Sequence, residues 1–162
     1  MNTTSTVEFK RPAWQTATML TLWFWLSGSL VLDWVIMPSL YFSGMMSQTD
    51  FTTAGYAMFW NFNRVELLSA AVVLTGVLAG SKTKSRWGGS SIVVSVILLV
   101  ITLVNTYFLT PQMCAVGIHL NLFETVLATP TQMNLLHGGY FVLEAIKLLL
   151  GGTLLSWCWR QV

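Results

Sequence analysis

Charged side chains are scarce in this sequence of 162 residues, where Asp, Glu, Lys and Arg together make up only 9%. An ordinary soluble domain has roughly 25%, and a soluble fold with so few charges could not cover its surface. A disordered chain is excluded as well, because disorder goes with abundant charge and few apolar residues. Hydrophobic residues make up 54% of the chain, and the mean hydropathy is +0.66. This composition indicates an integral helical membrane protein.

Recognisable catalytic and binding motifs are also missing from the sequence. It has no phosphate-binding loop, no Cys-x-x-Cys pair and no His-Glu-x-x-His zinc motif. The net charge is only +2 and no basic cluster occurs, so no nucleic-acid partner is expected. Cys114 and Cys158 are predicted on opposite sides of the membrane, too far apart for a disulfide. We therefore predict that the protein is not an enzyme and that its partners are the lipid bilayer and other membrane-protein subunits.

Four apolar stretches are each long enough to cross a bilayer as a helix, which takes about 20 residues. They cover residues 13–37, 51–80, 90–110 and 131–159. Pro38 and Pro111 are expected to end the first and third, because proline lacks the amide hydrogen that a helix needs. Apolar residues at near-helical spacing within 111–129 predict a short helix lying on the membrane surface. The predicted fold is an all-α, integral membrane four-helix bundle with a short interfacial helix between helices 3 and 4.

The basic residues outside the spans all fall on one side of this predicted bundle. They are Lys10, Arg11, Lys82, Lys84, Arg86 and Arg160. The other side has only the acidic residues Asp33, Asp50 and Glu124. Because cytoplasmic flanks of membrane proteins are rich in Lys and Arg, this asymmetry predicts that both termini are cytoplasmic. Residues 1–12 are then a cytoplasmic tail, and residues 13–162 form a single transmembrane domain.

Ionisable residues inside the spans are the most informative feature of the sequence. At about 1.5 Å of rise per residue, one depth of the membrane is shared by Arg64, Glu66, Asn105, Glu144 and Lys147. A charge at the bilayer centre costs roughly 2.5–3.5 kcal/mol, so we expect ion pairs. Depth pairs Arg64 with Glu144 and Glu66 with Lys147, and Glu144 could also pair with Lys147 within its own helix. This charge layer either locks the bundle together or forms a site for a solute, a proton or a cofactor.

The outer half of the fourth span is the predicted ligand or partner site. His137 is followed by two glycines, where another helix or a ligand can approach closely, and Tyr140 lies one turn further on. Asp33 on the first span falls at nearly the depth of His137, so these two residues are expected to pair. The alternative interpretation is that His137 has only a structural role.

Cofactor binding is left open by the sequence. Cys114 and His119 are weak candidates for metal ligands on the outer side, where several methionines also lie, and such soft ligands suit copper. Methionine is also a common filler of apolar packing. A histidine could instead bind a chlorophyll-type pigment, and a quinone is a further alternative.

Several short motifs resemble a known family. They are Trp25-Leu26-Ser27-Gly28-Ser29, Asp33, Pro38-Ser39-Leu40-Tyr41, Ala54-Gly55-Tyr56, Phe59 and Leu136-His137. Together they resemble the four-helix membrane domain of unknown function 4149, which is shared with transmembrane-protein-205-like proteins. Asn63-Arg64-Val65-Glu66 and Leu143-Glu144-Ala145-Ile146-Lys147 are similar to its cyanobacterial branch. The resemblance implies a four-helix fold and no established chemistry.

A cyanobacterial-type member implies a thylakoid or plasma membrane, where small four-helix proteins often serve larger complexes. The expected function is therefore a non-enzymatic accessory or assembly subunit of a larger membrane complex, for which a photosynthetic complex is one candidate. The alternatives are a carrier for a small solute or a soft metal such as copper, and a pigment- or quinone-binding membrane protein.

Overall fold

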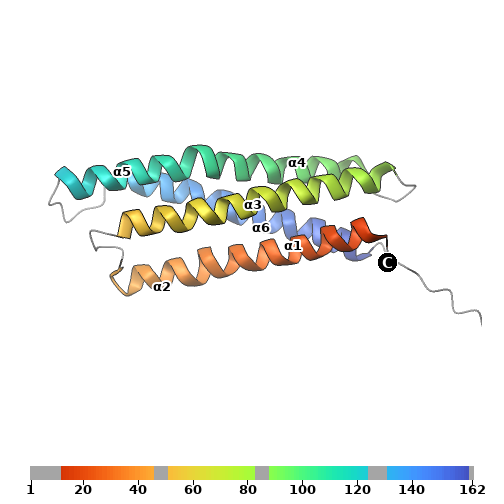
Figure 1. Cartoon of the computed structure of the whole chain (residues 1–162), viewed down its shortest axis with the longest axis horizontal. Helices are drawn as coiled ribbons and strands as arrows, with labels where there is room; N and C mark the ends of the chain where they lie inside the picture. Colours follow the sequence, from red (N-terminus) through yellow and green to blue (C-terminus); the bar gives the residue numbers. More distant parts are fainter. Residues whose placement is uncertain (1–11, 46–50, 83–87, 124–130, 161–162) are drawn as a thin grey trace, which may run out of the picture.

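The chain folds into four long helices that lie side by side (Figure 1), which confirms the predicted all-α four-helix bundle. The computed structural model describes residues 12–45, 51–82, 88–123 and 131–160. Each long helix contains about 30 residues apolar enough to span a membrane: Ala13–Phe42, Thr53–Lys82, Gly89–Gly117 and Thr131–Arg160.

Two of the four long helices are built from several segments joined end to end. The first consists of α1 (Ala13–Val31), the π-helical turn η1 (Leu32–Ile36) and α2 (Met37–Phe42). The third consists of α4 (Gly89–Val104), the π-helical turn η3 (Asn105–Leu109) and α5 (Thr110–Phe123). The second and fourth are the uninterrupted helices α3 (Phe51–Lys82) and α6 (Thr131–Arg160).

Pro38 and Pro111 do not end their helices, so this part of the sequence prediction was wrong. Each proline is the second residue of the segment that follows a π turn. In η1 and η3 the closing backbone bonds reach back five residues, from Met37 to Leu32 and from Thr110 to Asn105. A π turn is wider than an α turn, which leaves room for the proline ring against the preceding carbonyl groups. The helices therefore continue through both prolines.

The helix predicted on the membrane surface is also different in the structure. Residues 110–123 are helical as expected, but α5 directly continues the third membrane crossing, and its apolar stretch reaches Gly117. The reason is again the π turn before Pro111, which keeps the two segments in one helix. Residues 124–129, the rest of the predicted surface helix, lie outside the described residues.

The start of α1 and the end of α6 lie at the same end of the bundle, here called the termini end (Figure 1). Lys82 closes α3 and Arg160 closes α6, so both basic residues belong to this end. Lys10, Arg11, Lys84 and Arg86, on which the predicted orientation also depends, lie outside the described residues. The cytoplasmic position of the termini stays a prediction.

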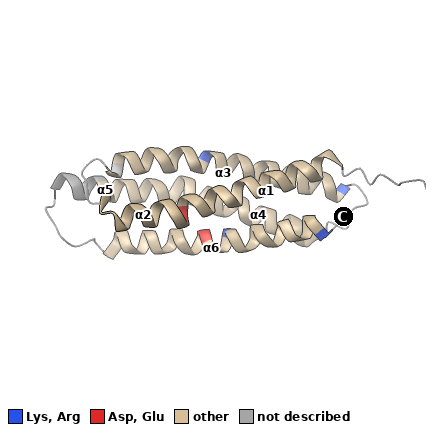
Figure 2. Cartoon of the chain, turned by 90° about the horizontal axis from the view of Figure 1, so that it is seen from below, with Lys and Arg blue, Asp and Glu red and all other residues tan. Residues whose placement is uncertain are grey.

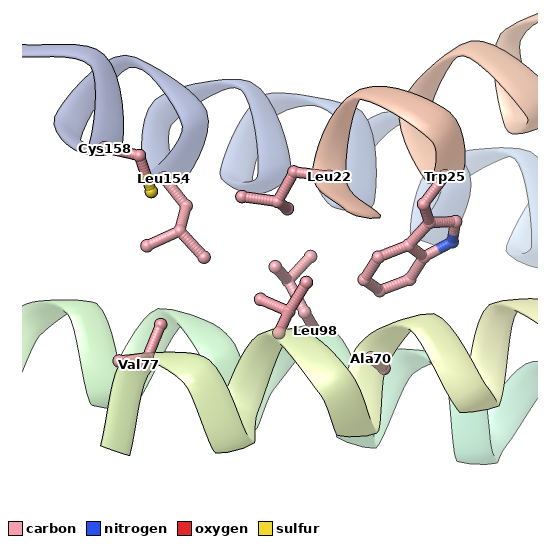
Figure 3. Close-up of a cluster of buried hydrophobic side chains, with 8 residues drawn as sticks. Leu22, Trp25, Ala70, Val77, Leu98, Leu154 and Cys158 are labelled. Atoms are coloured by element: carbon pink, nitrogen blue, oxygen red, sulfur yellow. The ribbon is translucent and has the colours of Figure 1, made fainter. Parts of the chain in front are cut away.

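A cluster of buried apolar side chains lies in the half of the bundle nearer the termini end (Figure 3), where buried polar residues such as Gln15 and Thr18 also lie. The apolar cluster, here called the dry core, consists of Leu22, Trp25, Ala70, Val73, Val77, Leu98, Leu154 and Cys158. Next to it, α1 and α3 approach closely at two glycines. A Cβ atom at Gly76 would lie 1.9 Å from Thr18 Oγ1, and one at Gly80 would lie 2.5 Å from the Trp14 ring. Small residues permit such close helix packing in membranes.

Charged residues occupy few positions along the helices (Figure 2), and the outside of the bundle carries large apolar side chains. Exposed examples include Trp23, Phe24, Trp34, Phe42, Tyr107, Phe108, Leu135 and Leu149. An apolar exterior over four long helices is the surface expected in contact with lipid. The buried interior is, by contrast, partly polar.

Candidate functional site

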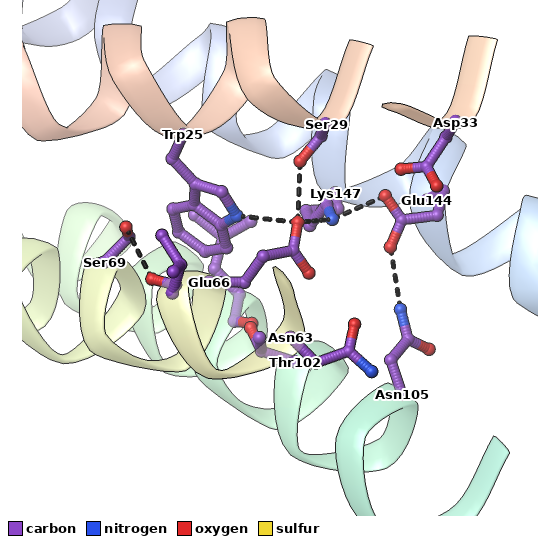
Figure 4. A network of polar contacts seen from close by, with 12 residues as sticks. Trp25, Ser29, Asp33, Asn63, Glu66, Ser69, Thr102, Asn105, Glu144 and Lys147 are labelled. Carbon is purple, nitrogen blue, oxygen red and sulfur yellow. Dashed lines mark hydrogen bonds and ion pairs between the residues drawn. The ribbon is translucent and has the colours of Figure 1, made fainter. Parts of the chain in front are cut away.

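A buried layer of polar side chains crosses the middle of the bundle and joins all four long helices (Figure 4). This polar layer consists of Trp25, Ser29, Asp33, Glu66, Asn105, Tyr140, Glu144 and Lys147, none of which is more than 3% exposed. Three of these residues are carboxylic acids, and Lys147 is the one base among them. The layer includes four of the five residues that the sequence placed at one depth.

Lys147 lies at the centre of the polar layer, between two carboxylates. Its ammonium group forms an ion pair with Glu66 of α3 and another, at 2.5 Å, with Glu144 one turn earlier on α6. The pairing of Glu66 with Lys147 that depth predicted is therefore present, as is the pairing within α6. Because both acids contact one ammonium group, Lys147 ties α3 to α6 in the membrane interior.

Glu66 receives hydrogen bonds from two side chains of α1 in addition to Lys147. Trp25 Nε1 donates at 3.0 Å and Ser29 Oγ donates at 2.6 Å, both to the same oxygen, Glu66 Oε1. An oxygen that accepts from two neutral donors and an ammonium group has the surroundings of an ionised carboxylate. Both α1 and α6 thus contribute donors to one oxygen of Glu66.

The other half of the polar layer contains Asp33 and Glu144. Asn105 Nδ2 donates to Glu144 Oε1 at 2.8 Å, and the Tyr140 hydroxyl donates to Asp33 Oδ1 at 2.9 Å. The carboxyl groups of Asp33 and Glu144 lie next to each other in the view of Figure 4. Asp33 belongs to η1 and Asn105 to η3, so both π turns contribute a polar side chain to the layer.

Arg64 does not belong to the layer, and its predicted pairing with Glu144 was wrong. Its side chain is exposed on α3, with the guanidinium carbon 4.3 Å from the centre of the Trp60 ring. Residues two positions apart on a helix do not share a face, so Arg64 cannot point inward where Glu66 does. The prediction matched the depths of the two residues and neglected the faces on which they lie.

The predicted pair of Asp33 and His137 is also absent from the structure. His137 is exposed, and its Nδ1 lies 3.0 Å from the backbone oxygen of Met133 on its own helix. Tyr140 lies about one helical turn further along α6, inside the polar layer, and its hydroxyl group donates to Asp33 Oδ1. Of the predicted ligand or partner site, Asp33 and Tyr140 come together in the buried layer, while His137 stays on the surface.

Two buried polar residues, Trp25 in the layer and Asn63 beside it, were not predicted from the sequence, whereas Ser29 falls at the predicted depth on the first span. Trp25 and Ser29 lie four residues apart on α1, so they share a helix face at the depth of Glu66. Asn63, three residues before Glu66 on α3, donates from Nδ2 to Thr110 Oγ1 at 2.8 Å. Helical spacing from Glu66 could have identified Asn63, because residues three apart lie on one face.

The weak metal candidates are not brought together in the described structure. Cys114 is a free, partly buried cysteine on α5, and the side chain of His119 lies outside the described part of the chain. Within that part, no group of three or more His, Cys, Asp or Glu residues is arranged to hold a metal ion. The pigment and quinone alternatives stay untested predictions.

Comparison with protein-family models, with curated proteins and with solved structures found no match to this chain. The resemblance to the four-helix domain of unknown function therefore remains a prediction from the sequence. What the site does must be argued from its own geometry.

Proposed function

We propose that this protein is a non-enzymatic accessory or assembly subunit of a larger membrane complex, and that Arg64 contacts an acidic transmembrane helix of another protein. The supporting observation is the position of Arg64. It lies about 16 Å from the Thr53 end of a span that runs to Lys82, and its side chain is exposed. A guanidinium group there faces the hydrocarbon region unless something covers it.

The surface around Arg64 has features that favour a polar contact. Asn61, one turn earlier on the same face of α3, is exposed as well, and its side-chain amide donates to the backbone oxygen of Ala57. Trp60 lies under the guanidinium group and stacks with Tyr56, with ring centres 5.8 Å apart. Since a mid-membrane charge costs roughly 2.5–3.5 kcal/mol, a carboxylate opposite Arg64 would lower the free energy of the assembly.

A second copy of this chain does not supply that carboxylate from the described residues of its spans. The three acids of those residues, Asp33, Glu66 and Glu144, are all buried within the bundle. The partner that fits is therefore a different protein, with an Asp or Glu facing outward from one of its own transmembrane helices. Charge complementarity in a medium of low dielectric would give the contact both strength and orientation.

The test is purification in mild detergent of the parent protein and two variants with the same loss of charge. Arg64→Leu removes the exposed mid-span charge, whereas Arg160→Leu removes an exposed charge at the end of α6. We expect the parent and Arg160→Leu to co-purify with a membrane protein that Arg64→Leu loses. A photo-crosslinker at Val65 should join the chain to a helix of that protein, and exchanging its acid for Arg should restore binding to Arg64→Glu.

Three outcomes would contradict the proposal. The parent protein could run alone as a single small particle, or both charge variants could keep the same partners. Arg64→Leu could also lose a bound anionic lipid and no protein, which would assign Arg64 to a lipid headgroup.

The finer points of location belong to the same proposal. A thylakoid or plasma membrane with cytoplasmic termini agrees with the sequence resemblance and with the basic residues Lys82 and Arg160 at the termini end. Labelling Cys114 from each side of sealed vesicles tests the orientation. Reaction from the cytoplasmic side would reverse it.

A further inference from the structure

The polar layer contains more acids than its bases can neutralise. Asp33, Glu66 and Glu144 face a single base, Lys147, and all four side chains are buried. With every group ionised, the layer would carry two net negative charges in the membrane interior. Buried like charges in a low dielectric disfavour full ionisation, and two carboxyl groups that share a site hold a proton between them.

The contacts favour Glu66 as the acid that carries the negative charge, through one of its oxygens; the other, Glu66 Oε2, is buried without a hydrogen-bond partner among the described residues. Glu66 Oε1 accepts hydrogen bonds from Trp25 and Ser29 and pairs with Lys147. These three donors stabilise a carboxylate, so the ammonium charge of Lys147 is matched first by Glu66. The unmatched charge then belongs to Asp33 and Glu144.

Two oxygen atoms of this second pair, Asp33 Oδ2 and Glu144 Oε2, have no hydrogen-bond partner among the described residues, and only Glu144 Oε2 is ion-paired. The Tyr140 hydroxyl donates to Asp33 Oδ1, Asn105 donates to Glu144 Oε1, and Glu144 Oε2 pairs with Lys147. The remaining atom, Asp33 Oδ2, is buried and unpartnered within that part of the chain. The side chains of Asp33 and Glu144 point toward each other in Figure 4. A proton on Asp33 Oδ2 would turn the unpartnered acceptor into a donor toward Glu144.

We propose that Asp33 and Glu144 share one exchangeable proton, which makes the polar layer a proton-binding site inside the membrane. The bound proton reduces the excess to one negative charge. That charge is stabilised by the neutral donors around the layer, namely Trp25, Ser29, Asn105 and Tyr140. Loss of the proton would place two like charges between η1 and α6. Proton binding is therefore coupled to the packing of the first helix against the fourth.

Infrared spectroscopy of the protein in lipid nanodiscs tests the proposal, because a protonated carboxylic acid has a carbonyl band that a carboxylate lacks. We expect the parent protein to show this band at neutral pH, and the band to shift in heavy water. Asp33→Asn and Glu144→Gln should each abolish it, because either change leaves two acids and one base. That is the same net charge as the proton-bound parent, so no bound proton is needed. Asp50→Asn is the matched control and should leave the band intact.

A milder variant keeps the test valid if the acid substitutions do not fold. Tyr140→Phe removes only the hydroxyl that donates to Asp33, so the band should move in frequency and persist. The proposal is overturned if the parent lacks the band, if the band survives in Asp33→Asn or Glu144→Gln, or if Tyr140→Phe leaves its frequency unchanged.

Discussion

The two halves of the bundle differ in the side chains that pack between their helices. Near the termini end, α-helices close over a dry core, and glycines let α1 and α3 approach closely. In the middle and beyond, two helices contain π turns, and the buried side chains include three acids and a lysine. The first half shows that these helices can pack through apolar contacts without buried charge. Buried charge in the other half is therefore a reason to look for function there.

The energetics of the two halves differ in the same way. Between helices in lipid, association depends on close van der Waals packing and on polar contacts rather than on the removal of water. In the dry core, substitutions that change the size of a side chain should destabilise the bundle most. In the polar layer, loss of one partner should matter most, because it leaves the other partner buried and unsatisfied.

Removing the base of the polar layer should have the largest effect. Lys147→Met leaves Glu66 and Glu144 buried without their counter-ion, and breaking such a pair costs about 3–5 kcal/mol. We expect a strong loss of folded protein in detergent unfolding experiments. The double variant Lys147→Met with Glu66→Gln should recover much of that loss. Equal behaviour of the single and double variants would mean that the pair contributes little.

Removing one neutral donor from the polar layer should have a smaller effect. Ser29→Ala deletes the hydroxyl that donates to Glu66 at 2.6 Å, and a hydrogen bond to a charged group is worth about 1.5–3 kcal/mol. Ser27→Ala is the matched control on the same helix, because Ser27 is exposed and its hydroxyl donates to the backbone oxygens of Trp23 and Phe24. Unfolding in detergent should separate the two variants, and equal stability would count against an ionised Glu66.

Adding a methyl group beside the dry core tests how closely α1 and α3 pack. Gly76→Ala places a Cβ atom 1.9 Å from Thr18 Oγ1, and overpacking of this kind costs about 1–3 kcal/mol. Gly152→Ala is the control, because nothing lies within 4 Å of the added atom. We expect a lower midpoint of unfolding for the first variant only. If both variants unfold alike, the close approach at Gly76 is not needed for the fold.

Arg64→Leu should have the smallest effect on the stability of the isolated bundle. The side chain is exposed and contacts Trp60, so the free energy of unfolding should change by about 0.5 kcal/mol or less. The contrast with Lys147→Met is informative, because both cations lie within membrane spans. A large destabilisation by Arg64→Leu would show that Arg64 supports the fold of the isolated bundle.

Much of the fold could be predicted because hydrophobic length alone decides whether a helix can cross a bilayer. The four spans begin within two residues of their predicted starts. Their ends were harder to predict wherever a proline followed. Whether Pro38 or Pro111 ends a helix depends on whether the preceding backbone can widen into a π turn, and that choice is not visible in the residue order.

The sequence prediction of the candidate site used the depth of each residue in the membrane and largely neglected the helix face on which its side chain lies. Depth brought together Glu66, Asn105, Glu144 and Lys147, all of which are in the polar layer. Depth also included Arg64, which the helical period places on a different face from Glu66. Because that period is a property of the residue order alone, a helical wheel of α3 separates the two side chains, and this error was avoidable.

The sequence by itself determined that the chain has four stretches long and apolar enough to cross a membrane and that acids and a lysine share one depth. Both follow from composition and from the constant rise of a helix. Only the tertiary structure decided that Trp25 and Ser29 donate to Glu66, that Tyr140 rather than His137 reaches Asp33, and that Lys147 lies between two carboxylates. These contacts depend on how each helix is rotated about its own axis and on the π turns that shift its register. Such rotations are set by packing between helices far apart in the sequence.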